Sequence, residues 1–548
     1  MKTISMRKLI AAIGAAALLS TAAVAIAPSA YAGAPTCTKA SDGIETCTGT
    51  LSNGADYLIK VPAKFGGTFF YWNHGIKFTY PFEAAGVFVP KGIEELTPTS
   101  STTKLNVDSE MLRAGYGLAT YDGKSTGGLR GWNTVDRVEM LKELIDTVKA
   151  KYTVKKGVIY GSSQAGSIMT PFIEKYPDYA DAVGIMAGVT PSIGQEVQSL
   201  CDMFYILSVF ADPTIKGCAA MGVKGLAGHY AAIGEFAKVV ALLTAWGGNL
   251  GAPGLEYPAA LKGSGIPQRS ALLLTGLLAG LPTKSSHMDG ITTSPVIAEQ
   301  SINATVAILE NFGEAIGTGT FGGQAISEIT GPGFYDNTKT NWFSLLDPAD
   351  SGRYNLGLSG DGAIAAMLGV LSLAPRVTGD AAAVAKLKAL DKSKFDTTKP
   401  VVLLSNEADR LVFAGNSALY VDKARAIYDA KFATYEAARD TAATSAERAA
   451  AAKLKPIWNV ASLYAMTPET YTVYTAQGLP NLSGPPAPSG VGHQTFTLKQ
   501  MMAWVKILAH AADTGKVGSP GYLQQYIKRA PGLNSDLDYR PADLKYTW

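Results

Sequence analysis

The sequence predicts an α/β protein with a mostly parallel central sheet, helices on both faces of that sheet, and a large, mainly helical inserted cap. Two observations support this prediction. Short apolar runs typical of buried strands alternate with amphipathic segments of helical period in residues 50–190, and again in residues 398–515. Between them, helix-like stretches broken by Gly and Pro replace the strand signals. Because parallel strands need long crossover connections, the alternation indicates βαβ units.

The individual elements follow from periodicity along the chain. Residues 57–62 alternate as a half-buried strand does, and residues 68–72 form an apolar run that stops at Asn73. The helix expected at residues 135–152 places Val138, Leu141 and Val148 on one face. The expected strands are residues 57–62, 68–72, 117–121, 157–160, 182–187, 401–405 and 470–475. The expected helices are residues 135–152, a segment after Ser163, and residues 233–246, 363–373, about 421–453 and 498–512.

The N-terminal residues have the pattern of a secretory signal peptide. Basic residues come first, an apolar run of residues 9–27 follows, and Ala30-Tyr31-Ala32 has the form that signal peptidase cleaves. We therefore expect cleavage near Ala32 and an exported chain that begins near Gly33. A retained membrane anchor is the alternative, and no later apolar stretch is long and uninterrupted enough to span a bilayer.

Composition and charge narrow the function classes. The formal net charge is +3 over 548 residues, so nothing electrostatic points to a nucleic acid or an anionic membrane as partner. The chain is long enough for a large core and an insertion. We expect four parts: a signal peptide (1–32), the first part of the core (33–190), the inserted helical cap (191–396) and the second part of the core (397–548). The oligomeric state is not predicted.

The four cysteines fall into two local pairs, which agrees with export. The simplest connectivity joins Cys37 to Cys47 and Cys201 to Cys218. A metal site is the alternative, but no C-x-x-C spacing or nearby histidine completes a tetrahedral set. We expect no metal and no cofactor.

Ser163 is the candidate nucleophile. It comes three residues after the apolar run of residues 158–160 and has Gly161 two residues before it and Ala165 two residues after it. A sharp strand-to-helix turn presses these two positions together, so only small side chains fit, and the segment matches a nucleophile elbow. The alternative is a serine-rich turn that caps a helix. Ala165 departs from the usual glycine.

A serine hydroxyl needs a base, and the base needs an orienting acid. Of the five histidines, His493 follows the late strand and a Pro-rich loop and precedes the last helix. Asp409 follows the strand of residues 401–405 and gives the chain order serine, acid, histidine. Glu407 is the alternative acid, because its longer side chain could also reach.

Backbone amides are expected to stabilise the negative oxygen of a tetrahedral intermediate. The amide of Gln164, directly after the nucleophile, is the first candidate. The second comes from the loop after residues 68–72, where the amide of Ile76 is favoured over that of Gly75. His74 and Tyr80 are candidates for the substrate pocket, although a tyrosine at this position is as easily part of the core.

Taken together, Asn73-His74-Gly75, residues 161–166, Asp409 and Gly492-His493 resemble the α/β-hydrolase superfamily. Residues 57–75 and 113–119 look like secreted bacterial members of the esterase and peptidase kind. The resemblance implies a triad at the carboxyl edge of the sheet and an insertion after the sixth strand that covers the pocket.

These residues favour hydrolysis of a small-molecule or polymeric carboxylic ester through an acyl-enzyme. A serine exopeptidase resembling prolyl or tripeptidyl aminopeptidases is the second hypothesis, and Glu299, Glu310 and Glu314 are candidates to bind a free amino terminus. A secreted binding protein without turnover is the third hypothesis.

Overall fold

The computed structural model describes residues 35–77, 93, 95–124, 131–248, 261–290, 302–396, 398–476, 480–484 and 489–548. The expected signal peptide lies outside these residues, as does Tyr80. Within the described residues, no helix has both the length and the apolar composition needed to cross a membrane.

A ten-stranded sheet organises the molecule, in the order β1-β2-β3-β5-β4-β6-β7-β8-β9-β10. Strands β4 to β9 are parallel to one another, whereas β1, β2, β3 and β10 are joined to the sheet by antiparallel pairs at its two edges. The strands are β1 (Thr36–Lys39), β2 (Glu45–Thr50), β3 (Asp56–Val61), β4 (Thr68–Asn73), β5 (Gly117–Tyr121), β6 (Lys156–Ser162), β7 (Ala182–Met186), β8 (Val401–Asn406), β9 (Val460–Ala465) and β10 (Leu533–Asn534). This strand order, with a sharp turn after β6, is the α/β-hydrolase fold, so the predicted fold class is confirmed.

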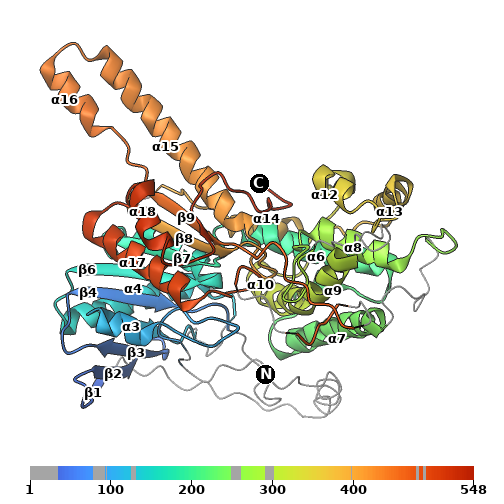
Figure 1. Cartoon of the computed structure of the whole chain (residues 1–548), viewed down its shortest axis with the longest axis horizontal. Helices are drawn as coiled ribbons and strands as arrows, with labels where there is room; N and C mark the ends of the chain where they lie inside the picture. Colours follow the sequence, from blue (N-terminus) through green and yellow to red (C-terminus); the bar gives the residue numbers. More distant parts are fainter. Residues whose placement is uncertain are drawn as a thin grey trace.

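Helices cover both faces of the sheet because every central strand is apolar on both sides (Figure 1). One face packs on α4 (Thr134–Lys151), α5 (Gly166–Lys175) and α15 (Gly415–Thr441), with Tyr71, Ile159 and Leu403 in the shared core. The other face packs on α3 (Asp108–Arg113), α17 (Leu498–Thr514) and α18 (Pro520–Ile527), with Trp72 and Trp504 fully buried.

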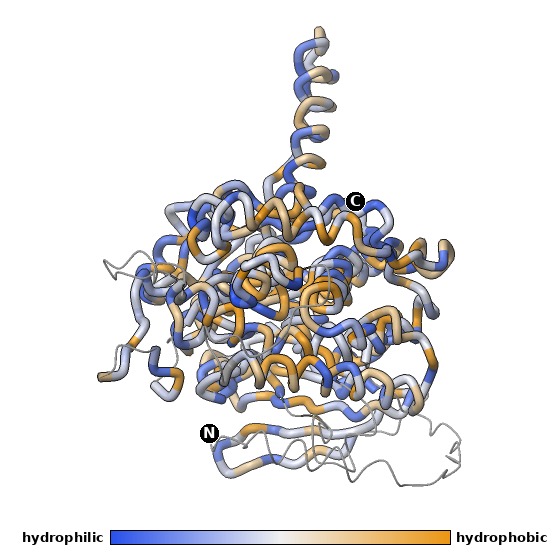
Figure 2. The backbone as a smooth tube through the Cα atoms, turned by 90° about the vertical axis from the view of Figure 1, so that its right-hand side faces the viewer, coloured by the Kyte–Doolittle hydropathy of each residue, from blue (hydrophilic) through white to orange (hydrophobic). Residues whose placement is uncertain are grey.

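The described elements between β7 and β8 are helical and lie beside the sheet as a separate layer (Figure 1), which we call the cap. A single apolar cluster joins its helices, and Val412 and Phe413 of the core extend that cluster. Figure 2 shows the apolar segments gathered inside the molecule. The α-helices of the cap are α6 (Ile193–Phe210), α7 (Leu226–Gly248), α8 (Gln268–Ala279), α9 (Ile302–Gly317), α10 (Gly323–Thr330), α11 (Trp342–Leu345), α12 (Pro348–Arg353), α13 (Asp361–Leu373) and α14 (Ala381–Ala389).

Two element predictions are wrong. Residues 470–475 are not a strand, because the backbone amides of Tyr471 and Thr472 donate to Asp289 of the cap instead of to a neighbouring strand. The strand in this part of the chain is β9. The helix expected at residues 421–453 is two helices, because Thr444 caps the start of α16 (Ser445–Lys453) in a capping box with Glu447. The distal part of α15 and α16 form a hairpin that projects from the molecule (Figures 1 and 2).

Candidate active site

Ser163 occupies a sharp turn between β6 and α5. Its backbone has φ of 56°, in the left-handed region that a non-glycine residue adopts at a cost of about 1–3 kcal/mol. A Cβ added at Gly161 would lie 2.3 Å from the carbonyl oxygen of Asn73 and 2.7 Å from the Cβ of Ala165. A Cβ at Gly166 would lie 2.4 Å from the carbonyl oxygen of Val189. The close approaches therefore fall at Gly161 and Gly166, and the alanine at position 165 fits.

Asp409 is the carboxylate that contacts His493. Its Oδ2 lies 2.9 Å from His493 Nδ1, and its Oδ1 accepts hydrogen bonds from the amides of Leu411 (2.9 Å) and Val412 (3.0 Å). The Asp409 side chain is fully buried, and that of His493 is 12% exposed. Burial alone would lower the pKa of His493, but the adjacent Asp409 carboxylate outweighs it and the net shift is upward. The imidazole therefore becomes protonated more readily than a free histidine.

Glu407, the alternative acid, has other partners. Its carboxylate accepts from the amide (2.7 Å) and hydroxyl (2.6 Å) of Thr467, from Lys284 Nζ (3.1 Å) and from the hydroxyl of Tyr539 (3.0 Å). Burial favours a raised pKa for Glu407, but the hydrogen bonds from Thr467 outweigh it and the pKa is lowered. Glu407 is thus a structural anion, and the structure places Asp409 beside the imidazole instead.

Ser163 and His493 line the same cavity of about 340 Å³. Within the described residues the Ser163 hydroxyl has no hydrogen-bond partner, and His493 Nε2 lies 3.1 Å from Nε2 of the Gln494 side chain. Catalytic hydrogen bonds are often long or unformed in substrate-free enzymes. Ser163 and His493 therefore line one cavity without a direct hydrogen bond between them.

The loop after β4 lies against Ser163. A Cβ added at Gly75 would come within 3.0 Å of Ser163 Cβ and 3.5 Å of its Oγ, so only glycine fits there without a shift. Gly75 and Ile76 both line the cavity. The loop and the Gln164 turn therefore meet at Ser163, which is where amide donors for an oxyanion are required.

A buried arginine joins this loop to the turn. Arg137, on α4, donates through Nη2 to the carbonyl of His74 (2.8 Å), through Nη1 to Oε1 of Gln164 (2.7 Å) and through Nε to the hydroxyl of Tyr121 (3.4 Å). Its side chain is 1% exposed. Arg137 lies four positions before Leu141, on the apolar face of the predicted helix. A charged residue on such a face is a signal of a buried polar role, and sequence reasoning missed this signal.

His74 contributes to the cavity wall, but its ring nitrogens are engaged with the backbone. Nε2 accepts from the amide of Gly123 (2.9 Å), so Nδ1 carries the proton and donates to the carbonyl of Gly75 (2.6 Å). This neutral tautomer satisfies both nitrogens. The arrangement fixes the loop, whereas the proposed contact of His74 with substrate stays a prediction.

The rest of the cavity wall includes a carboxyl group that sequence reasoning did not single out. Glu196, on α6, lines the cavity and accepts from the amide of Phe413 (3.1 Å) and from Nδ2 of Asn416 (3.2 Å). Burial raises its pKa to about 8, and the nearby Asp409 carboxylate adds to the rise. The rest of the cavity wall is mixed: Lys77, Glu95 and Thr318 line it together with a larger group of apolar side chains. The apolar group includes Ile76, Trp132, Val189, Ile193, Val197, Leu200, Ile326, Leu411 and Val412.

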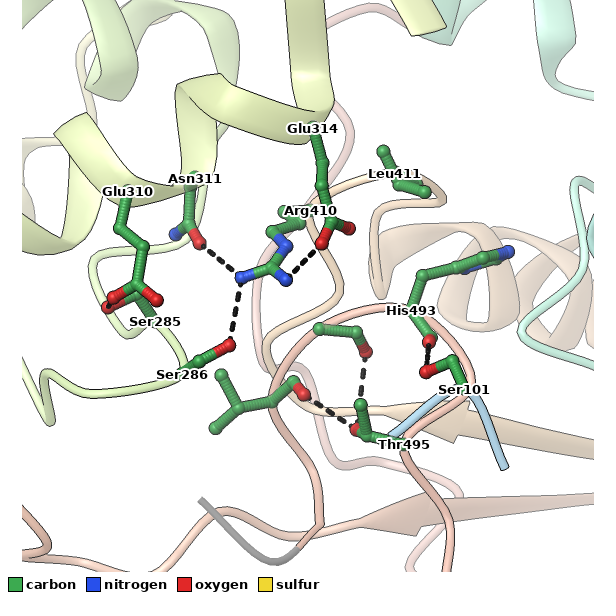
Figure 3. Close-up of polar contacts among 12 residues, drawn as sticks. Ser101, Ser285, Ser286, Glu310, Asn311, Glu314, Arg410, Leu411, His493 and Thr495 are labelled. Carbon is green, nitrogen blue, oxygen red and sulfur yellow. Dashed lines mark hydrogen bonds and ion pairs between the residues drawn. The ribbon is translucent and has the colours of Figure 1, made fainter. Parts of the chain in front are cut away.

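Arg410, the residue after Asp409, ties the loop of residues 407–414, which we call the acid loop, to the cap (Figure 3). Arg410 donates to Glu314 and Asn311 (3.4 Å) of α9 and to the hydroxyl of Ser286 (3.1 Å). These contacts bind the acid loop to α9 and to Ser286, and the hydrogen bond from the amide of Phe413 to Glu196 binds it to α6. The position of Asp409 therefore depends on cap packing as well as on the sheet.

Both predicted disulfides are present, Cys37–Cys47 and Cys201–Cys218. The first lies between β1 and β2, and the second ties α6 to the turn at Gly217–Ala220 within the cap. Glu45 lies near the first pair. Because the sulfurs are bonded to each other, that group offers no thiolates to a metal ion.

The sequence matches no protein-family model, and no curated protein matches it. Among solved structures, feruloyl esterase B from Aspergillus oryzae is similar at 12% identity over 79% of this chain and 78% of that chain, with a TM-score of 0.31. A second esterase from Aspergillus oryzae aligns at 13% identity over 77% and 72% of the two chains, with a TM-score of 0.29. Likeness at this level carries no argument about activity, so the function is argued from the site.

Proposed function

We propose that the protein hydrolyses carboxylic esters through an acyl-enzyme, with Ser163 as nucleophile, His493 as base and Asp409 as the acid that orients it. One observation carries the proposal: a serine on a strained turn and an imidazole bonded to a buried carboxylate line one cavity. A strained turn persists only where the surrounding structure enforces it, and such turns cluster at active sites.

The proposed reaction begins when Ser163 Oγ attacks the ester carbonyl carbon and His493 Nε2 takes the hydroxyl proton. Asp409 stabilises the imidazolium through Nδ1. The carbonyl oxygen becomes negative and faces the amides of Gln164 and of Ile76 or Gly75. His493 then gives the proton to the departing alkoxide, which leaves as an alcohol. Water attacks the acyl-enzyme by the same route and releases the acid. The reaction requires no cofactor.

The cavity supports a substrate with an apolar group next to the ester. Cap helices α6 and α10 and the acid loop contribute apolar side chains to its wall, and the charged residues Lys77 and Glu95 also line the cavity. A space of about 340 Å³ is of the size that small-molecule sites have. We propose that this group is the acyl or aryl part of a small-molecule or polymeric ester.

The carboxylates considered for an exopeptidase are engaged elsewhere. Glu310 contacts His287 (2.8 Å) and Ser285 (2.7 Å), and Glu314 accepts from Arg410. Glu299 lies outside the described residues. Because the described candidates have partners of their own, we favour an ester over a peptide with a free amino terminus.

Export is also part of the proposal. The two disulfides support an oxidising compartment, since such bonds are rare in the reducing cytosol.

The division into core and cap at residues 190 and 396 also stays a prediction.

The test compares Ser163→Ala with Ser162→Ala against p-nitrophenyl esters and aminoacyl p-nitroanilides. Ser162 is a matched control because its buried hydroxyl has no hydrogen-bond partner in the described part of the chain, so its removal leaves no described group unsatisfied. We expect ester turnover in the wild type and in Ser162→Ala, and its loss in Ser163→Ala. Turnover of anilides alone would assign a peptidase, and ester turnover that survives Ser163→Ala would refute the proposal.

A further inference from the structure

The basic nitrogen of His493 has a hydrogen-bond partner in this structure. Nδ1 donates its proton to Asp409, so Nε2 carries the lone pair. The Gln494 side-chain nitrogen lies 3.1 Å from Nε2, and an amide nitrogen is only a donor. Gln494 therefore donates to the lone pair that would have to receive the proton of Ser163.

The backbone around Gln494 is held in place. The Gln494 residue has φ of 57°, and its carbonyl accepts a hydrogen bond from the amide of Ser101 (3.0 Å). The Ser101 hydroxyl donates to the carbonyl of His493 (2.5 Å), as Figure 3 shows. Only the torsions of the Gln494 side chain are then free to move its amide. Because Gln494 lines the catalytic cavity, that side chain has space into which it can turn.

We propose that Gln494 is a displaceable donor that blocks the basic nitrogen of His493 and turns aside before Ser163 bonds to it. This inference rests on the proposed function. It accounts for two observations together: the occupied lone pair of His493 and, within the described part of the chain, the unpartnered hydroxyl of Ser163. The two donors compete for one acceptor, so Gln494 is a positioning residue that sets how often the nucleophile is activated.

The competition predicts a rate change of known sign. Gln494→Ala and Gln494→Met both remove the donor, and methionine keeps most of the side-chain volume. Each variant should increase the reactivity of Ser163 by about fivefold, the factor that one neutral hydrogen bond represents. Gln494→Glu should decrease it, because a carboxylate at this position would hold a proton on Nε2. It would add to the carboxylates of Asp409 and Glu314, which raise the pKa of His493, whereas Arg410 lowers it.

The measurement is the second-order rate constant for modification of the full-length protein by a small alkyl fluorophosphonate. In this reaction the Ser163 oxygen forms a bond to phosphorus, the phosphorus–fluorine bond breaks, fluoride leaves, and His493 takes the serine proton. Such a probe requires no substrate pocket, so the rate constant reports the availability of the base. Circular dichroism of each variant verifies that the fold is intact.

Faster modification of both Gln494→Ala and Gln494→Met, with slower modification of Gln494→Glu, would support the inference. Unchanged or slower modification of Gln494→Ala would overturn it. A gain in Gln494→Ala alone would also overturn it, because the side chain would then act through its bulk. If the wild type and Ser163→Ala react alike, the proposed function fails; if Ser163 is modified but the Gln494 variants match the wild type, only this inference fails.

Discussion

Replacement of Glu196 by glutamine should change the pH dependence of stability. The pKa of Glu196 is about 8 in the folded protein, against an ordinary value of 4.5. Unfolding therefore releases a proton between these pH values, so the folded state loses stability as the pH rises through that range. Since a glutamine at this position does not titrate, the variant lacks this loss.

The size of the effect follows from the two pKa values. One pKa unit corresponds to about 1.4 kcal/mol, so the stability of the wild type relative to Glu196→Gln should fall by about 4 kcal/mol between pH 5 and pH 9. The introduced glutamine places its amide nitrogen against Nδ2 of Asn416, which adds a constant cost of about 1–3 kcal/mol to the variant. The variant should be less stable than the wild type at pH 5 and more stable at pH 9.

The assay is urea unfolding followed by tryptophan fluorescence at several pH values. Glu469→Gln, which replaces an exposed carboxylate, is the control and should show much less change in its difference from the wild type. If the free-energy difference between the wild type and Glu196→Gln stays constant from pH 5 to pH 9, Glu196 is already ionised in the folded protein and the reasoning is refuted.

Four further predictions concern the site and the cap. Asp409→Asn should lower kcat by about 10⁴-fold and shift the acidic limb of kcat/KM to lower pH, because the carboxylate that raises the pKa of His493 is lost. Glu407→Gln should leave this limb in place, and pH–rate profiles of the two variants test the difference. Arg137→Lys should lower kcat by at least about tenfold and also reduce stability, because a lysine cannot bond His74, Gln164 and Tyr121 at once. A kcat equal to that of the wild type would contradict the role of the guanidinium. Gly75→Ala should lower kcat/KM by about 100-fold, because the new Cβ would lie 3.0 Å from Ser163 Cβ and displace the loop; steady-state kinetics with an intact thermal transition test this. Replacement of Cys201 and Cys218 together by serine should reduce the free energy of unfolding by about 3 kcal/mol, which equilibrium denaturation measures; an unchanged midpoint would contradict a stabilising bond.

The sequence was sufficient for the central sheet and for the order of the candidate site residues. The apolar runs that became β4, β6 and β8 carry large side chains, are flanked by turn residues and are buried on both faces, so their signal is strong. The small residues around Ser163 reflect a local steric demand that is visible without a structure. The strand β9 was missed because Val460–Ala465, although as long as β4 and β8, is rich in small residues.

Side chains whose roles depend on distant contacts were not predictable. Glu196 and Arg410 act across the boundary between cap and core, with partners far away in the sequence. Gln494 resembles any polar residue in a loop until its amide is placed against the imidazole. Periodicity reports which face of an element is buried, but it does not report which partner a buried polar group meets.

The central claim is that Ser163 becomes acylated. The most direct measurement is mass spectrometry of the protein after brief mixing with an ester that deacylates slowly, followed by peptide mapping. The account predicts a mass increase equal to the acyl group on the peptide that contains Ser163, and no such increase in Ser163→Ala. Ester hydrolysis with no acylated peptide, or with the acyl group on a different residue, would contradict it.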